Sequence, residues 1–322
     1  MPRFIIQHIT RYTYPEPVRD SANQIMLFPI KDHLQEVQHQ RLVITGEPAV
    51  ETYSDYYGNE AGSFMHIAPH NELRIESTIS VITKPVELPK DDRPADEQWK
   101  NLEAIRFVVP YIDFLKQEQF ASKHEVLQIA NPQLFENKTV FQTASELNNY
   151  VFQQFKYIKG VTSIESTIEE VWQLKAGVCQ DFAHILLVML RLLQIPARYV
   201  SGYVCPHDHQ LRGEGATHAW VEAYIPFYGW LGFDPTNNCI VSDLHVRLAI
   251  GRSFTDCSPV RGTYKGTASQ TLEVGVSVSH EDGQVMNEVA AVLTPQPKAP
   301  VNENGTPYNS YQQHLQMIQQ QQ

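Results

Sequence analysis

The chain has 322 residues, 42% hydrophobic and 19% charged, which predicts two or three folded domains and excludes wholesale disorder. Its 25 Lys and Arg against 36 Asp and Glu give a net charge of −11, which repels phosphate backbones and anionic lipid. We therefore expect neither nucleic acid nor a membrane as a partner.

No segment of the sequence predicts export or membrane insertion. The opening MPRFIIQHIT has no apolar core of signal-peptide length, and the apolar run at 185–195 is too short to cross a bilayer. We therefore expect a cytoplasmic protein. The four cysteines, at 179, 205, 239 and 257, form no C-x-x-C pair, so single thiols are expected rather than a disulfide framework or a zinc ribbon.

The sequence pattern divides the chain into four parts. Residues 1–83 carry short runs of β-branched and aromatic residues between turn signals, which predict a β-rich N-terminal domain. The proline-rich, charged segment at 84–98 is typical of a connector. A second domain is expected over 99–294, and the Gln-rich end at 295–322 is expected to be a disordered tail.

Helical spacing opens the second domain and strand patterns close it. The segment TASELNNYVFQQF predicts a helix that begins near Ser145, and the segment at 179–193 is apolar nearly all round, which indicates a buried helix. Strand patterns follow in PARYVSGYV, ATHAWVEAYIP, GWLGFD and TLEVGVSVS. Helices followed by an antiparallel sheet predict an α+β fold.

Cys179 stands at the predicted start of the buried helix, shortly after Gly177, which permits a tight turn. The unpaired N–H groups and the dipole at a helix start stabilise a thiolate, which is the nucleophilic form of cysteine. A lone cysteine is more often a buried, inert residue. The catalytic interpretation therefore depends on the strands that follow the helix.

Those strands, ATHAWVEAYIP and GWLGFDP, predict a hairpin. If it folds symmetrically about Pro226, His218 lies opposite Asp234 on the same face of the sheet. The carboxylate then accepts from one imidazole nitrogen and leaves the other for a thiol, whereas a register shift of one residue would move Asp234 to the other face. A thiol at a helix start, a histidine base and an orienting carboxylate supply the roles needed for covalent acyl transfer.

Other histidines and cysteines fit this chemistry less well. His184 lies about 140° around the helix from Cys179, so we expect it to be a packed or hydrogen-bonded helix residue. Cys205, His207 and His209 are metal ligands by type, but their segment is typical of a loop and no second set of ligands completes a known spacing. We therefore expect no metal and no cofactor.

Long motifs give the chain a family resemblance. The segments AGVCQDFAHILLVMLRLLQIPARYVSGYV, THAWVEAYIPFYGWLGFDPTNN and HVRLAIGRSFTDCSPVRGTYKG resemble bacterial transglutaminase-like proteins, which are described as proposed cysteine proteases. The strands up to residue 83 resemble the β-rich N-terminal region of that family. The resemblance implies a papain-like core with a catalytic helix packed on an antiparallel sheet. It also implies that Cys179 is the nucleophile, His218 the base and Asp234 its partner.

The residues that would complete the site are less distinct. The Cys179 N–H is the first expected donor to an oxyanion, and Gln173 and Tyr157 are candidates for the second, each with a packing or surface role as its alternative. Trp220 shares the predicted face of His218, so it is a candidate wall of a substrate pocket or a core residue. Asp181 is expected to accept from N–H groups of the first helical turn.

The chemistry common to these residues is thiolate attack on an amide carbonyl, formation of a thioester and release of an amine. Water as the second acceptor gives a peptidase or amidase, and a lysine amine gives a transglutaminase. Because we find no calcium-loop motif or pro-segment to control crosslinking, hydrolysis of a peptide or protein amide is favoured. A noncatalytic binding or scaffold module is a further alternative, and the oligomeric state is left open.

Overall fold

The protein is described here from a computed structural model, which describes residues 1–130, 137–205, 212 and 217–280. The chain divides into two compact units. We call residues 83–257 the core unit, and residues 2–82 together with the described residues after 257 the sheet unit. No helix in the described part of the chain combines the length and the apolar character needed to cross a bilayer.

The sheet unit is a seven-stranded antiparallel sheet arranged around one long strand. Its strands are β1 (Arg3–Ile25), β2 (Gln35–Ile44), β3 (Glu51–Ser54), β4 (Glu60–His66), β5 (His70–Thr83), β13 (Val260–Lys265) and β14 (Thr271–His280). The first half of β1 pairs with β5 and β14, and its second half pairs with β4 and β13. Alternate residues of β1 are buried, as the period of two in its sequence requires.

The last two strands do not follow the sequence-based domain boundary. The expected second domain, 99–294, includes β13 and β14, yet both strands pair with β1 in the sheet unit. A period of two predicts that a segment is a strand, but the choice of partner is made by backbone hydrogen bonds that carry no sequence pattern. The expected tail at 295–322 lies outside the described residues.

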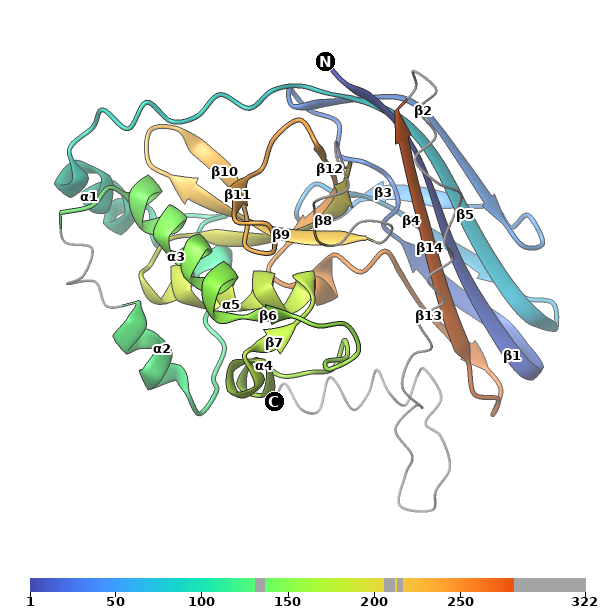
Figure 1. The fold of residues 1–322 in the computed structure, drawn as a ribbon. Helices are drawn as coiled ribbons and strands as arrows, with labels where there is room; N and C mark the ends of the chain where they lie inside the picture. The colour runs from blue at the N-terminus through green and yellow to red at the C-terminus, as the bar shows by residue number, and fades with distance from the viewer. Residues whose placement is uncertain (131–136, 206–211, 213–216, 281–322) are drawn as a thin grey trace. The chain divides into compact units, whose positions relative to one another are not determined.

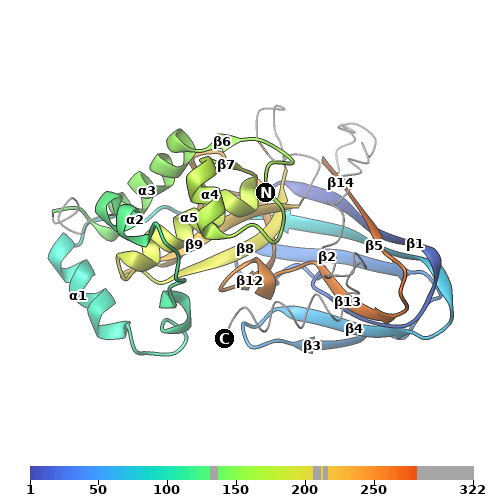
Figure 2. The ribbon, with the colours of Figure 1, turned by 90° about the horizontal axis from the view of Figure 1, so that it is seen from below.

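The core unit is a helical layer against a five-stranded antiparallel sheet (Figures 1 and 2). Its helices are α1 (Ala95–Ile105), α2 (Lys123–Ile129), α3 (Val140–Gln154), α4 (Ile168–Leu174) and α5 (Cys179–Leu192), with 3-10 turns η1 (Asp113–Leu115) and η3 (Phe254–Asp256). Its strands are β6 (Lys156–Tyr157), β7 (Ala176–Gly177), β8 (Ala197–Val204), β9 (His218–Ile225), β10 (Gly229–Asp234), β11 (Cys239–Ile240) and β12 (His245–Gly251). The sheet order is β11-β10-β9-β8-β12, and β6 and β7 form a separate parallel pair. This arrangement confirms the α+β prediction.

The expected connector at 84–98 forms part of the core unit. Residues 84–94 have no regular structure, and α1 begins at Ala95, before the expected boundary. The Gln98 side chain bonds Asp91, and the hydroxyl of Tyr228 donates to the carbonyl of Glu87. These bonds fix the segment against its own unit, so it is not a free linker.

Helix α5 is the centre of the core unit, as its sequence predicts. Every residue of α5 except Gln180 and His184 is buried, because β8 and β9 pack along it and α3 and α4 pack beside it. Buried Arg191 is satisfied by backbone carbonyls: its guanidinium donates to Ala197 at 2.9 Å and to Arg252 at 2.6 Å. These hydrogen bonds satisfy the buried guanidinium and link α5 to neighbouring segments of the core unit.

Helix α3 begins earlier than the sequence analysis places it. The expected start is near Ser145, but the helix begins at Val140 after Thr139. The Thr139 side chain accepts from the Gln142 N–H at 3.2 Å, and the Gln142 side chain accepts from the Thr139 N–H at 3.4 Å. This T-x-x-Q pair is a capping box, so the sequence did contain the correct signal.

The face of β9 that carries His218 also carries Trp220 and Glu222, since side chains alternate along a strand. Trp220 is fully buried with Val200 and Val241. Glu222 is paired with Arg198 at 2.6 Å across the sheet. Trp220 and Glu222 thus follow His218 on the same face of β9.

Gly202 of β8 pairs with His218 and leaves room for Trp220. A Cβ at position 202 would lie 2.1 Å from the Val246 carbonyl oxygen and 2.5 Å from the Trp220 ring. We therefore expect Gly202→Ala to lower the free energy of unfolding by about 1–3 kcal/mol, because overpacking forces the strand or the indole to move. Urea unfolding measures the change, with Ser201→Ala as the control at the adjacent buried position. Equal stability of Gly202→Ala and wild type would contradict this packing.

Candidate active site

Helix α5 begins at Cys179, which confirms the predicted helix start. The carboxylate of Asp181 accepts from the Val178 N–H at 2.7 Å and from the Thr162 hydroxyl at 2.7 Å, so it closes the first turn as expected. Gly177 is extended within β7 rather than in a tight turn. A Cβ there would lie 2.3 Å from the Asp181 carboxylate, so glycine is required for close approach.

His218 and Asp234 meet across the β9–β10 hairpin. Nε2 of His218 lies 2.8 Å from Oδ2 of Asp234, and both side chains are buried. The predicted register, symmetric about Pro226, is wrong by two residues. Ile225 pairs with Gly229, so the hairpin is centred on Phe227, which adopts a left-handed φ of 65°. A shift of two keeps both side chains on one face, and they meet diagonally instead of directly.

The other imidazole nitrogen is available to the thiol. Nδ1 of His218 is buried and has no nitrogen or oxygen partner among the described residues. Burial alone would lower the pKa of His218, but the charge and hydrogen bond of Asp234 and the contact with Cys179 outweigh it and raise that pKa to about 10. The Cys179 thiol also lies 3.9 Å from the carbonyl oxygen of Thr217, the residue before His218. The structure therefore brings Cys179, His218 and Asp234 together.

Two residues that the sequence analysis missed also hold the Asp234 carboxylate. Oδ2 accepts from the Asn237 side chain at 2.7 Å, and Nε2 of His245 lies 3.5 Å away. Oδ1 accepts from the backbone N–H groups of Thr236 at 2.9 Å and Asn237 at 3.3 Å. Burial would raise the pKa of Asp234, but the charge and hydrogen bond of His218, together with the hydrogen bond of His245, hold it well below its ordinary range. The D-P-T-N run was a turn signal for Asn237, whereas nothing local in the sequence pointed to His245.

Asp234, Cys239 and His245 place ligand-type atoms within 4.8 Å of one another. The hydrogen bonds fit a metal-free arrangement better. Nδ1 of His245 accepts from the Ser242 N–H at 3.3 Å, which leaves the proton on Nε2, facing Asp234. A histidine ligand usually donates its second ring N–H to an acceptor, and here that nitrogen faces a donor. His245 therefore acts as a hydrogen-bonded support for Asp234.

Tyr157 is near the site and Gln173 is not directed to it. Tyr157 lies in β6, paired with Gly177 two residues before Cys179, and burial followed by the charges of Cys179 and Asp234 raises its pKa. Gln173 is exposed on α4 and donates its amide to Ser122 at 2.9 Å, so its candidacy as an oxyanion donor is not supported by its position. Tyr157 therefore remains a candidate for the second donor to the oxyanion.

The remaining candidates have structural positions. Trp220 is fully buried and meets His245 edge to face with ring centroids 5.2 Å apart, so it is a core residue rather than a pocket wall. His184 accepts from the Phe254 N–H at 3.2 Å, as a hydrogen-bonded helix residue would. Cys205 is buried, and His207 and His209 lie outside the described residues.

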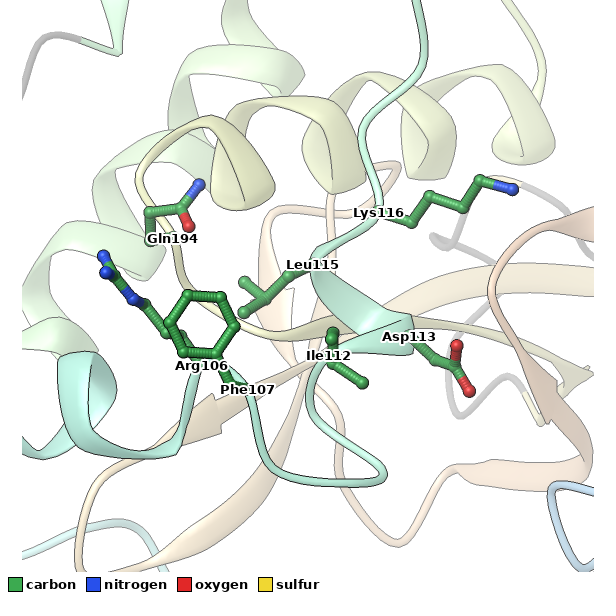
Figure 3. Close-up of a pocket in the computed structure, with 7 residues that line it drawn as sticks. All are labelled: Arg106, Phe107, Ile112, Asp113, Leu115, Lys116 and Gln194. Atoms are coloured by element: carbon green, nitrogen blue, oxygen red, sulfur yellow. The ribbon is translucent and has the colours of Figure 1, made fainter.

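A hollow elsewhere in the core unit is not lined by Cys179, His218 or Asp234 (Figure 3). It is lined by Arg106, Phe107, Ile112, Asp113, Leu115, Lys116 and Gln194. Arg106 stacks on Phe107 with its guanidinium carbon 4.6 Å from the ring centre. The residues that line this hollow include no cysteine and no histidine, so it is not the candidate active site.

The raised pKa of His218 makes the stability of the protein depend on pH. Its pKa is 6.5 as a free group and about 10 in the folded chain, so its stabilising effect is complete below 6.5 and is lost as pH rises toward 10. The free energy of unfolding should therefore fall by up to ~1.4 kcal/mol per pH unit from this residue alone.

The effect of His218 on stability is best measured between about pH 6.5 and 8. Burial lowers the pKa of Lys175 to about 8, so above that pH the Lys175 amine makes the free energy of unfolding rise with pH and opposes the effect of His218. Urea unfolding at several pH values should show a shallower slope in His218→Gln, which does not titrate. Identical slopes in the two proteins would contradict the shift.

Comparisons with known proteins find similarity in two regions of the chain. Residues 128–235 match the transglutaminase-like superfamily, and residues 4–82 match the bacterial transglutaminase-like N-terminal region. The uncharacterized protein ML0607 of Mycobacterium leprae is 29% identical over 282 residues, which cover 87% of this chain and 99% of that protein. A protein-glutamine gamma-glutamyltransferase of Pseudomonas aeruginosa is 30% identical over 100 residues, which cover 29% of this chain and 15% of the enzyme.

Among solved structures, a proposed cysteine protease from Cytophaga hutchinsonii shares the fold. Its TM-score is 0.69 at 21% identity, and the superposition covers 95% of this chain and 96% of that one. The two family models together match residues 4–82 and 128–235, so the chain belongs to the transglutaminase-like superfamily and carries the N-terminal region of its bacterial members.

Proposed function

We propose that the protein is a cysteine-dependent amide hydrolase, a peptidase or amidase, in which Cys179 is the nucleophile, His218 the base and Asp234 the orienting carboxylate. The observation that carries the proposal is that the two ring nitrogens of His218 have different surroundings. Asp234 occupies Nε2 at 2.8 Å, and Nδ1 is left for the thiol at the start of α5. A nucleophile, a base and a group that orients the base are the parts needed for acyl transfer.

The reaction would proceed in two steps. The Cys179 thiolate attacks the amide carbon, and the negative oxygen is stabilised by the Cys179 N–H, which has no partner within the helix. His218 gives the proton on Nδ1 to the leaving nitrogen, the carbon–nitrogen bond breaks, and a thioester remains. Water then attacks the thioester as His218 takes its proton, the carbon–sulfur bond breaks, the acid is released, and the Cys179 thiolate and protonated His218 are restored. The hydroxyl of Tyr157 is the candidate for a second donor to the oxyanion.

Acyl transfer to an amine is the second candidate function. It uses the same thioester, and the similarity of 100 residues to a protein-glutamine gamma-glutamyltransferase favours it. Hydrolysis is favoured by the shape similarity to a proposed cysteine protease. Incubation with a peptide library, with and without an amine, followed by mass spectrometry, separates the two: hydrolysis gives the acid in both samples, and transfer gives amine adducts.

A noncatalytic binding module is the third candidate, and thiol reactivity tests it. Burial raises the pKa of Cys205 well above its ordinary value and that of Cys239 to about 12, and Cys257 is fully buried. We expect iodoacetamide to alkylate Cys179 at least tenfold faster than any of these three, because an imidazolium neighbour stabilises the thiolate. Peptide mapping after timed quenching gives the four rates, and equal slow rates would support the noncatalytic module.

Replacement of the nucleophile should separate activity from folding. Cys179→Ala is expected to abolish turnover of any substrate found in the library, while its unfolding midpoint stays close to that of wild type, because one sulfur atom at the end of a helix contributes little packing. Cys239→Ala is the control, since both ring nitrogens of His245, the imidazole near its thiol, already have hydrogen-bond partners. Activity that survives in Cys179→Ala would identify a different nucleophile.

The base and its carboxylate should differ in effect. His218→Ala removes proton transfer altogether, whereas Asp234→Asn keeps an imidazole in a wrong or mobile tautomer. We therefore expect kcat to fall by orders of magnitude in both, with Asp234→Asn retaining at least as much activity as His218→Ala. Steady-state kinetics at one pH checks the order, and a reversed order would mean that Asp234 does more than orient the ring.

A further inference from the structure

Arg212 is held beside the triad by its backbone. Its N–H donates to the side-chain oxygen of Asn237 at 2.7 Å, and the Asn237 side-chain nitrogen lies 3.3 Å from the Arg212 carbonyl oxygen. The same Asn237 nitrogen donates to Oδ2 of Asp234 at 2.7 Å. One amide therefore links the backbone of Arg212 directly to the triad carboxylate.

The Arg212 side chain is exposed and is steadied by an aromatic ring. Its guanidinium carbon lies 4.6 Å from the centre of the Phe152 ring on α3, which is the geometry of a cation–π contact. Stacking of this kind leaves the N–H edge of the guanidinium open to a ligand. In the described part of the chain, no carboxylate forms an ion pair with Arg212.

Arg212 also lies within electrostatic reach of the catalytic groups. The Tyr157 hydroxyl feels the charges of Cys179 and Asp234, and the charge of Arg212 acts on it with the opposite sign. The two carboxylates nearby, Asp234 and Asp181, are buried and already hydrogen-bonded. In a chain with a net charge of −11, Arg212 forms no ion pair with any residue that the structure describes, so its charge is the one that an incoming anion would meet.

We infer that Arg212 binds a carboxylate of the substrate close to the amide that Cys179 attacks. The inference rests on the proposed function and narrows its substrates to peptides or amides that carry an acidic group beside the scissile bond. Arginine suits this role because its planar N–H groups bind both oxygens of a carboxylate. Asn237 couples the two parts of the site, since it holds Arg212 and the triad carboxylate at once.

A pair of thiol reagents tests the inference without a known substrate. Iodoacetate and iodoacetamide react with Cys179 in the same way but differ in charge, so the ratio of their rates reports a positive group near the sulfur. The imidazolium of His218 raises this ratio in every variant, and Arg212 should raise it further. We expect Arg212→Gln to lower the ratio on the order of fivefold.

Matched variants make the result specific. Arg106→Gln removes another exposed arginine that stacks on a phenylalanine at the same 4.6 Å distance, in the hollow of Figure 3, and should leave the ratio unchanged. Arg212→Lys keeps the charge and should retain most of the preference. Added salt should lower the wild-type ratio toward that of Arg212→Gln, because the arginine is exposed to solvent. A second pair, 3-maleimidopropionate and N-propylmaleimide, places the carboxylate farther from the reacting carbon.

The outcomes separate this inference from the proposed function. If iodoacetamide fails to alkylate Cys179 faster than the other cysteines, the proposed function itself is wrong. If alkylation is fast but both reagent pairs give the same ratios in wild type and Arg212→Gln, the triad stands and Arg212 does not bind the substrate's carboxylate. A fall of the ratio in Arg106→Gln as large as in Arg212→Gln would also overturn the inference, because the effect would then reflect net charge alone.

Discussion

The buried carboxylate of Asp234 is the constraint that organises the core unit. It is fully removed from solvent, and an unpaired charge in such a place costs several kcal/mol. Its two oxygens therefore require donors, and those donors come from β9, from β12 and from the turn after β10. The bonds that make the charge tolerable also fix the ring of His218, so the stability of the sheet and the geometry of the site have the same origin.

The meeting of Cys179, His218 and Asp234 could be predicted from sequence because it depends on two robust patterns. A segment that is apolar nearly all round begins at Cys179 and defines the start of α5, and the alternation of side chains requires only that His218 and Asp234 share a face. The predicted centre of the hairpin was wrong because the turn places Phe227 at a positive φ, where a bulky residue gives no composition signal. The face was still correct, since a slip of two residues preserves it.

The support around the site could not be predicted in the same way. His245 approaches Asp234 from β12, which is three places from β10 in the sheet order, and the missing side chain at Gly202 makes room for the Trp220 ring that packs on His245. Such contacts depend on strand order, which no local pattern encodes. The prediction for Gln173 fails for the opposite reason. Its nearness in sequence to Cys179 suggested a role as an oxyanion donor, but α4 directs its side chain outward to Ser122.

The split of the sheet unit between both ends of the described chain sets an order of assembly. Strand β1 is made first, yet two of its partners, β13 and β14, follow the whole core unit in sequence. Proteins fold largely from the N-terminus during synthesis, and pairings between distant residues form slowly. Until residue 280 has left the ribosome, β1 keeps unpaired edge groups that can pair with other chains. The region that starts the chain is therefore the last to be completed, after the core unit has had time to close around α5.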